Sequence, residues 1–184
     1  MVSRGAGGNT LADLLFGKAS PSGRLPLTFY QSFNDLPAYE NYAPKGRTYR
    51  CFYGKAQYPF GFGLSYTTFD FSWQQQPAAT YQLQDTIRFT LNVTNTGKFD
   101  ADELVQVYIE YPALERMPLK ELKSFKKVSI GKGKIKVISL SVPVNELQKW
   151  DKATNAWKLY AVKYAMSINK NGREVLFKKE FSIQ

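Results

Sequence analysis

The sequence predicts a mainly β protein, in which an immunoglobulin-like β-sandwich follows a partial α/β remnant and an aromatic-rich linker. Three observations predict this fold class. Strand-like alternation runs from about residue 68 almost to the end of the chain, while the first 30 residues contain one helix signal. The stretch between them, residues 29–73, holds fifteen of the 28 Phe, Tyr and Trp residues.

The N-terminal segment carries few secondary-structure signals. Asn9 or Thr10 can cap a helix whose apolar positions recur over residues 11–15, and Gly17 suits the left-handed position after its end. The short apolar run at 25–29 predicts a strand. One helix and one strand cannot enclose a hydrophobic core, so we interpret this segment as the tail of a larger α/β domain.

The aromatic-rich stretch is also rich in proline and glycine, which interrupt regular helices and strands. Its rings need a surface to bury them, and packing against a neighbouring domain is the favoured interpretation. The alternative is that some rings line a carbohydrate site, because aromatic side chains also stack on sugar faces.

The remainder of the chain predicts about seven short strands, which is the number expected of an immunoglobulin-like or fibronectin type III-like sandwich. They are expected near residues 68–73, 87–93, 104–111, 123–130, 135–142, 157–168 and 174–183. Turn signals at 95–97, 131–133 and 169–172 separate several of them. We therefore divide the chain into residues 1–66, the remnant with its linker, and residues 67–184, the sandwich.

The composition excludes several classes of chemistry. There is no histidine, and Cys51 is the single cysteine, so a histidine-dependent triad, a Cys/His zinc site and an internal disulfide are all excluded. We expect no metal site and no cofactor. No apolar run is long enough for a membrane span, and the first residues show no signal-peptide core.

The formal charge of +10 raises the question of a nucleic-acid partner. Lysines are densest between residues 126 and 136. The lysines at 132, 134 and 136 alternate with a glycine, an isoleucine and a valine, as on the solvated face of a strand. We therefore expect no nucleic-acid partner.

Short motifs along the chain carry a family resemblance. They are GGN at 7–9, ADLLFG at 12–17, PSGRLPLTF at 21–29, GRTYR at 46–50, YPFGFGLSYTTF at 58–69, VTNTG at 93–97, DELVQVY at 102–108 and PLKELKSFKKV at 118–128. In this order and spacing they resemble the C-terminal part of family 3 glycoside hydrolases, the β-glucosidases and β-xylosidases. The resemblance implies the end of an α/β sandwich domain followed by a fibronectin type III-like domain.

The resemblance also implies where catalysis resides. Similar enzymes carry an aspartate nucleophile on an N-terminal (β/α)8 barrel and an acid/base carboxylate on the next domain, both upstream of the residues matched here. Retaining hydrolysis needs two carboxyl groups about 5–5.5 Å apart. Asp13, Asp35, Glu40 and Asp70 are the acids of the first 75 residues, and none lies in a motif for either role. We expect no catalytic residue and no activity from the chain alone.

Four residues on a loop bounded by glycine and proline are candidate substrate contacts: Arg47, Tyr49, Arg50 and Tyr53. The tyrosine rings could stack on a sugar, and the arginines could bind its hydroxyl or carboxylate groups. The alternative is that this loop pins the sandwich onto the α/β domain.

The predicted function is that of a C-terminal fragment or subunit of a β-glycosidase acting on β-glucosides or β-xylosides. The expected partners are the catalytic domains, with an oligo- or polysaccharide as a further ligand, in a secreted or periplasmic setting. The alternative is a non-catalytic carbohydrate-binding or protein-interaction module.

Overall fold

The computed structural model describes residues 7–114 and 117–184. Its helices and strands in chain order are α1 (Gly7–Leu15), β1 (Phe29–Tyr30), α2 (Thr48–Cys51), β2 (Ala56–Tyr58), β3 (Phe69–Gln75), β4 (Thr80–Tyr81), β5 (Thr86–Asn95), β6 (Ala101–Glu110), β7 (Lys120–Ile130), β8 (Ile135–Pro143), β9 (Lys149–Asp151), β10 (Ala156–Lys158), β11 (Lys163–Asn169) and β12 (Val175–Ile183). Two 3₁₀ turns lie at Phe33–Asp35 and Val144–Leu147.

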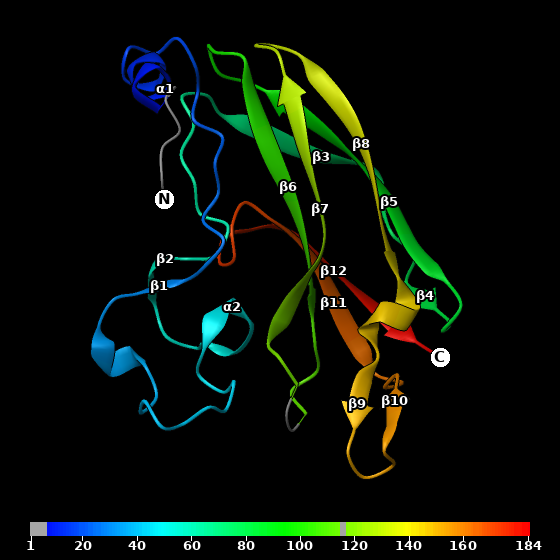
Figure 1. The fold of residues 1–184 in the computed structure, drawn as a ribbon. Helices are drawn as coiled ribbons and strands as arrows, with labels where there is room; N and C mark the ends of the chain where they lie inside the picture. The colour runs from blue at the N-terminus through cyan, green and yellow to red at the C-terminus, as the bar shows by residue number, and fades with distance from the viewer. Residues whose placement is uncertain (1–6, 115–116) are drawn as a thin grey trace.

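Two β-sheets form the body of the described molecule (Figure 1). One has five strands in the order β4-β12-β11-β6-β7, and the other has three in the order β3-β5-β8. Neighbouring strands are antiparallel except for β4 and β12, which run parallel. The predicted mainly β fold is therefore confirmed.

The two sheets bury their inner faces in one hydrophobic core. Phe89 and Leu91 of β5 alternate with outward-facing residues, and Val107 of β6 and Ile168 of β11 meet them from the other sheet. All four side chains are at most 1% exposed. The buried members of this cluster lie between Tyr81 and Ile183, so the sandwich strands supply the core themselves.

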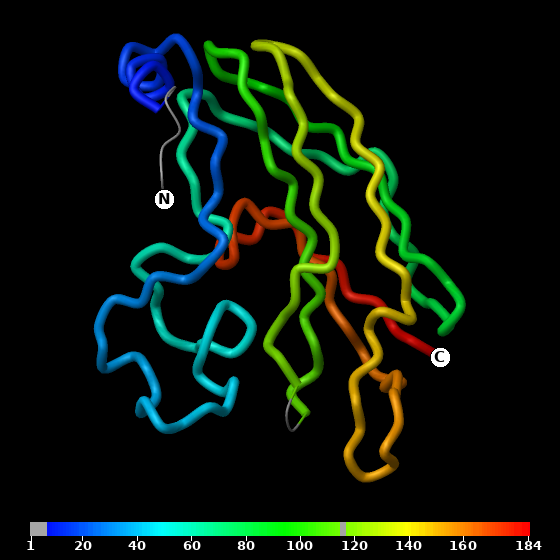
Figure 2. The backbone as a smooth tube through the Cα atoms, in the orientation of Figure 1, coloured from blue at the N-terminus to red at the C-terminus, as the bar shows by residue number. Residues whose placement is uncertain are grey.

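The chain before the sandwich has no comparable core. Among the described residues 7–66, only Ala56 and Gly61 are buried, and α1 buries no side chain. This stretch runs along one side of the sandwich as an irregular trace with one small ribbon of β1 and β2 (Figure 2). The segment therefore lacks a hydrophobic core of its own, as its few secondary-structure signals indicated.

The strand expected at residues 25–29 is largely absent, and β1 comprises Phe29 and Tyr30 alone. Leu25 instead exchanges backbone hydrogen bonds with the turn at 61–62, where its N–H donates to the Phe62 carbonyl at 2.8 Å and its carbonyl accepts from the Gly61 N–H at 2.8 Å. Pro26 then has no N–H with which to continue a ladder. The segment is thus held by local pairing without becoming a regular strand.

Two expectations in the sandwich were wrong in detail. The strand expected at 157–168 is broken at residues 159–162 into β10 and β11. Lys136 lies opposite Val93, which is fully buried, so this lysine shares the inner side of the sheet at its end. Lys136 is nevertheless exposed, as are Ile135 and Val137. Both faces of the strand reach solvent at this end, so the lysines are solvated as expected, although Lys136 lies on the inner side.

Candidate functional site

The loop around α2 lies against the sandwich and forms the candidate site. The ring of Tyr49 stacks on Phe60 at a centroid distance of 4.3 Å and meets the edge of the buried Tyr108 ring at 5.8 Å. The Tyr49 hydroxyl oxygen accepts a hydrogen bond from the backbone N–H of Leu122 at 3.2 Å. Tyr49 therefore attaches α2 to β6 and β7.

Arg50 attaches the same short helix through a charged cluster. Its guanidinium forms an ion pair with Glu121 of β7, and its backbone carbonyl accepts from the N–H of Leu119 at 2.7 Å. Glu121 is 5% exposed and also forms ion pairs with the ammonium groups of Lys123 at 3.1 Å and Lys149 at 2.5 Å. A buried carboxylate thus joins the linker, β7 and β9 through three cations.

The hydroxyl of Tyr111 completes this cluster by donating to Glu121 at 2.7 Å. Burial raises the pKa of Tyr111, with a further contribution from the neighbouring Tyr164. Burial, with the charges of Lys123 and Arg50, lowers the pKa of Lys149 to about 8. Breaking one partner out of such a buried ion cluster leaves uncompensated charge, so the cluster stabilises one fixed arrangement of the loop.

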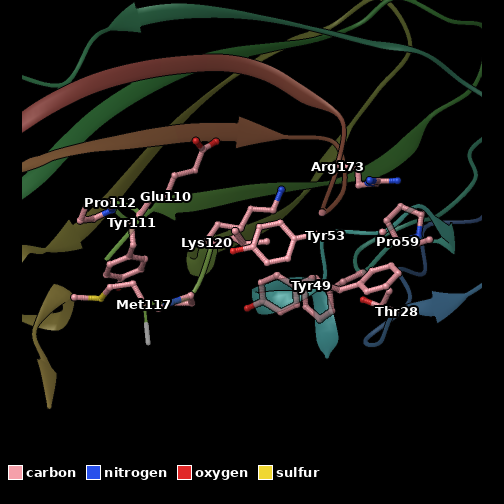
Figure 3. Close-up of a pocket in the computed structure, with 18 of the residues that line it drawn as sticks. Thr28, Tyr49, Tyr53, Pro59, Glu110, Tyr111, Pro112, Met117, Lys120 and Arg173 are labelled. Carbon is pink, nitrogen blue, oxygen red and sulfur yellow. The ribbon is translucent and has the colours of Figure 1, made fainter. Parts of the chain in front are cut away.

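A cavity of about 720 Å³ opens beside Tyr49, between the α2 loop, the β6–β7 end of the sheet and the β11–β12 turn (Figure 3). Its aromatic lining consists of Tyr49, Phe52, Tyr53, Phe60 and Tyr111. Its charged lining consists of Glu110, Lys120 and Arg173. This volume is in the usual range for a small-molecule site.

The four predicted site residues are therefore divided between two environments. Tyr49 and Tyr53 line the cavity, and the Tyr53 side chain is 75% exposed. Arg47 turns onto its own loop, where its guanidinium donates to the carbonyls of Asn41 at 2.7 Å and Ala38 at 3.3 Å. Arg47 and Arg50 are not among the described residues that line the cavity.

Neither Lys120 nor Arg173 was predicted as a site residue. Both come from the sandwich, far along the chain from the α2 loop: Lys120 begins β7, paired with Glu110 of β6, and Arg173 lies in the turn between β11 and β12. Lys120 lies within a motif that already carried the family resemblance, which was the available signal.

The described residues show no cluster of three or more His, Cys, Asp or Glu side chains that could hold a metal ion. Within the same part of the chain, no helix is long and apolar enough to cross a membrane.

Two family models match the chain. The glycosyl hydrolase family 3 C-terminal domain matches residues 3–66, and the fibronectin type III-like domain matches residues 103–171. The class of protein is thus a family 3 C-terminal domain joined to a fibronectin type III-like sandwich.

Similar proteins come from bacteria and fungi. The chain is 40% identical to a xylan 1,4-beta-xylosidase of Xylanibacter ruminicola over 162 residues, which covers 86% of this chain and 18% of that protein. It is 35% identical to a periplasmic beta-glucosidase of Salmonella typhimurium, covering 79% of this chain and 21% of that one. The chain therefore spans about a fifth of the length of these relatives.

Solved structures agree in fold. The GH3 beta-glucosidase of Bifidobacterium adolescentis superposes with a TM-score of 0.84 at 32% identity, covering 97% of this chain and 28% of the other. A beta-glucosidase from Kluyveromyces marxianus gives a TM-score of 0.84 at 31% identity, covering 96% and 23%. The chain matches the C-terminal portion of family 3 β-glucosidases and β-xylosidases, as its motifs predicted.

Proposed function

We propose that the chain is the C-terminal part or a subunit of a β-glycosidase acting on β-glucosides or β-xylosides. It supports the catalytic domains of a family 3 enzyme and has no activity alone. The similarity to a periplasmic beta-glucosidase favours a periplasmic or secreted setting for the complete enzyme.

The observation that carries this proposal is the apolar surface of the N-terminal segment. Phe16 is 82% exposed, Phe33 is 92% exposed, and Tyr39 and Tyr42 are each 86% exposed. Isolated soluble proteins rarely expose so many large rings in one segment, and such a surface marks a contact with another body. The same segment matches the family 3 C-terminal domain. The surface is therefore covered by the rest of that domain and by the catalytic domain next to it.

Restoration of activity tests this proposal. The chain is assayed with nitrophenyl β-glucoside and β-xyloside, alone and after co-expression with the barrel and α/β domains of a family 3 enzyme that lacks its own C-terminal part. We expect no turnover alone and turnover from a co-purifying complex. A matched variant, Phe16→Asp with Phe33→Asp, should abolish the complex while leaving the sandwich folded. Turnover by the chain alone, or no complex with the unaltered chain, would contradict the proposal.

A carbohydrate-binding role is the second candidate, and one pair of rings favours it. Trp150 and Trp157 face each other across the β9–β10 ribbon with centroids 5.8 Å apart, and both are exposed. Exposed indole rings offer sugars a stacking surface. Affinity electrophoresis in xylan and β-glucan gels separates the candidates, since unretarded migration is expected if the chain serves only as support.

A further inference from the structure

The described lining of the 720 Å³ cavity beside Tyr49 carries more positive than negative side chains. Its described lining contains one carboxylate, Glu110, and two cationic side chains, Lys120 and Arg173. Glu110 is already engaged, because its carboxylate accepts from the ammonium of Lys178 at 2.6 Å. Among the described lining residues, cationic side chains therefore outnumber carboxylates, although Glu110 lies opposite Lys120 in the β6–β7 register.

Lys120 lies in a partly desolvated position. Its ammonium group lies 5.6 Å from the centre of the Tyr108 ring, on the side of the sheet that faces the α2 loop. Burial lowers the pKa of Lys120, and the positive charge of Arg173 adds to that effect, although Glu110 opposes it. A half-buried ammonium group binds an anion more strongly than a fully solvated one, because electrostatic attraction is less screened there.

Aromatic side chains form the rest of the wall. Tyr53 presents an exposed ring next to Lys120, with Tyr49 close by (Figure 3). The ring of Tyr49 stacks on Phe60, which also lines the cavity. Flat rings pack against the C–H faces of a pyranose, while a cation donates charge-assisted hydrogen bonds to a carboxylate. Aromatic rings and an excess of cationic side chains in one cavity are a combination that suits an acidic sugar.

We propose that this cavity binds a saccharide bearing a carboxylate, a uronic acid unit, with Lys120 and Arg173 at the carboxylate and Tyr53 at the sugar ring. The proposal rests on the proposed function in one respect, namely that the ligand is a saccharide. It concerns binding by the chain itself and involves no chemical step.

Direct titration of the full chain tests it. Isothermal titration calorimetry measures the affinity for glucuronate, glucose, acetate and inorganic phosphate. Glucose tests the sugar ring without the charge, and acetate and phosphate test the charge without the ring. We expect glucuronate to bind at least about tenfold more tightly than glucose or acetate, since a charge-assisted hydrogen bond is worth a factor of this order. Raising the salt concentration should weaken the binding of glucuronate and leave the affinity for glucose unchanged.

Three variants locate the site. Arg173→Gln changes an exposed turn residue, and Lys120→Met removes the ammonium group over Tyr108 while keeping an unbranched apolar side chain. Each substitution should weaken the binding of glucuronate about fivefold or more and leave the circular dichroism spectrum unchanged. Lys152→Gln is the control, because Lys152 lines a neighbouring cavity and is exposed. Equal loss in the control would show a general effect of net charge and would overturn the assignment.

Other outcomes also decide the matter. Equal affinity for glucuronate and glucose, equal affinity for glucuronate and phosphate, or no saturable binding up to tens of millimolar would each overturn the proposal. Failure here leaves the restoration of glycosidase activity unaffected, and failure of that restoration leaves the titration unaffected. The two proposals are therefore tested independently.

Discussion

Individual side chains decide what the α2 loop does, and Tyr49 and Tyr53 make the contrast clear. Both are tyrosines on the same loop, and both line the same cavity. Tyr49 is stacked and hydrogen-bonded to the sandwich, while Tyr53 is largely exposed. The sequence could nominate both residues but could not separate them, because Tyr108 and Leu122, which hold Tyr49 from the sheet, lie more than fifty residues away along the chain.

This contrast gives a prediction for the enzyme assembled with its catalytic domains. Tyr49→Ala should lower the free energy of unfolding by about 2 kcal/mol, from lost burial and lost ring stacking. Tyr53→Ala should change it by no more than about 0.5 kcal/mol, as is usual at exposed positions. If Tyr53 contacts substrate, its loss should raise the KM for nitrophenyl glycosides several-fold.

Thermal unfolding and steady-state kinetics measure the two effects, and Tyr53→Phe serves as the control because it keeps the ring. An unchanged KM in Tyr53→Ala would remove Tyr53 from the substrate contacts. A large loss of stability in that variant would instead assign it a packing role.

At the scale of elements, the linker is held by close backbone approach. Residues 58–63 cross β6 at Gly61, whose φ is +75° and whose carbonyl accepts from the side-chain amide of Gln106 at 3.3 Å. A Cβ added at Gly61 would lie 2.2 Å from the Gln106 side-chain oxygen. The glycine-rich motif is thus explained by contact with the sheet as well as by turn geometry.

Gly61→Ala should therefore destabilise the full chain by about 2–3 kcal/mol, combining backbone strain with overpacking. Gly133→Ala is the matched control, since Gly133 has a similar φ of +67° but no atom within 4 Å of the added Cβ. It should cost about 1 kcal/mol from backbone strain alone. Urea unfolding measures both, and equal losses would show that the approach to Gln106 is unimportant.

For the whole molecule, the sequence predicted those parts of the fold that local patterns determine. The alternation over residues 87–93 predicted β5, because a strand with one buried face must repeat every two residues. The break after β10 and the orientation of Lys136 were missed, because they depend on where one strand ends beside another. The cavity could be predicted only on its linker side, since Lys120 reaches it through the β6–β7 pairing and Arg173 from the turn between β11 and β12.

Buried tyrosines make the stability of the sandwich sensitive to alkaline pH. Burial raises the pKa of Tyr81, Tyr108, Tyr111 and Tyr164 above the ordinary value. Above about pH 10 these tyrosines ionise in the unfolded chain and stay protonated in the folded one. The unfolded state then binds fewer protons, so the free energy of unfolding falls as the pH rises.

Lys149 affects the pH dependence of stability in the opposite direction and at lower pH. Its pKa is lowered to about 8, so between pH 8 and about 10.4 the unfolded chain binds the extra proton and stability rises with pH. We therefore expect a shallow rise to about pH 10 and a steep fall beyond it. The fall beyond pH 10 should grow with the number of buried tyrosines whose pKa is raised.

Urea unfolding of the full chain at pH 8, 10, 11 and 12 measures this profile. Tyr164→Phe is the control, since its hydroxyl donates to the Tyr160 carbonyl at 3.0 Å and its ring stacks on Phe181. The variant keeps the ring and removes one ionisable group. Its free energy of unfolding should therefore fall less steeply above pH 10, by the contribution of one tyrosine hydroxyl. Stability that stays constant from pH 10 to 12 would mean that these hydroxyl groups reach solvent in the folded protein.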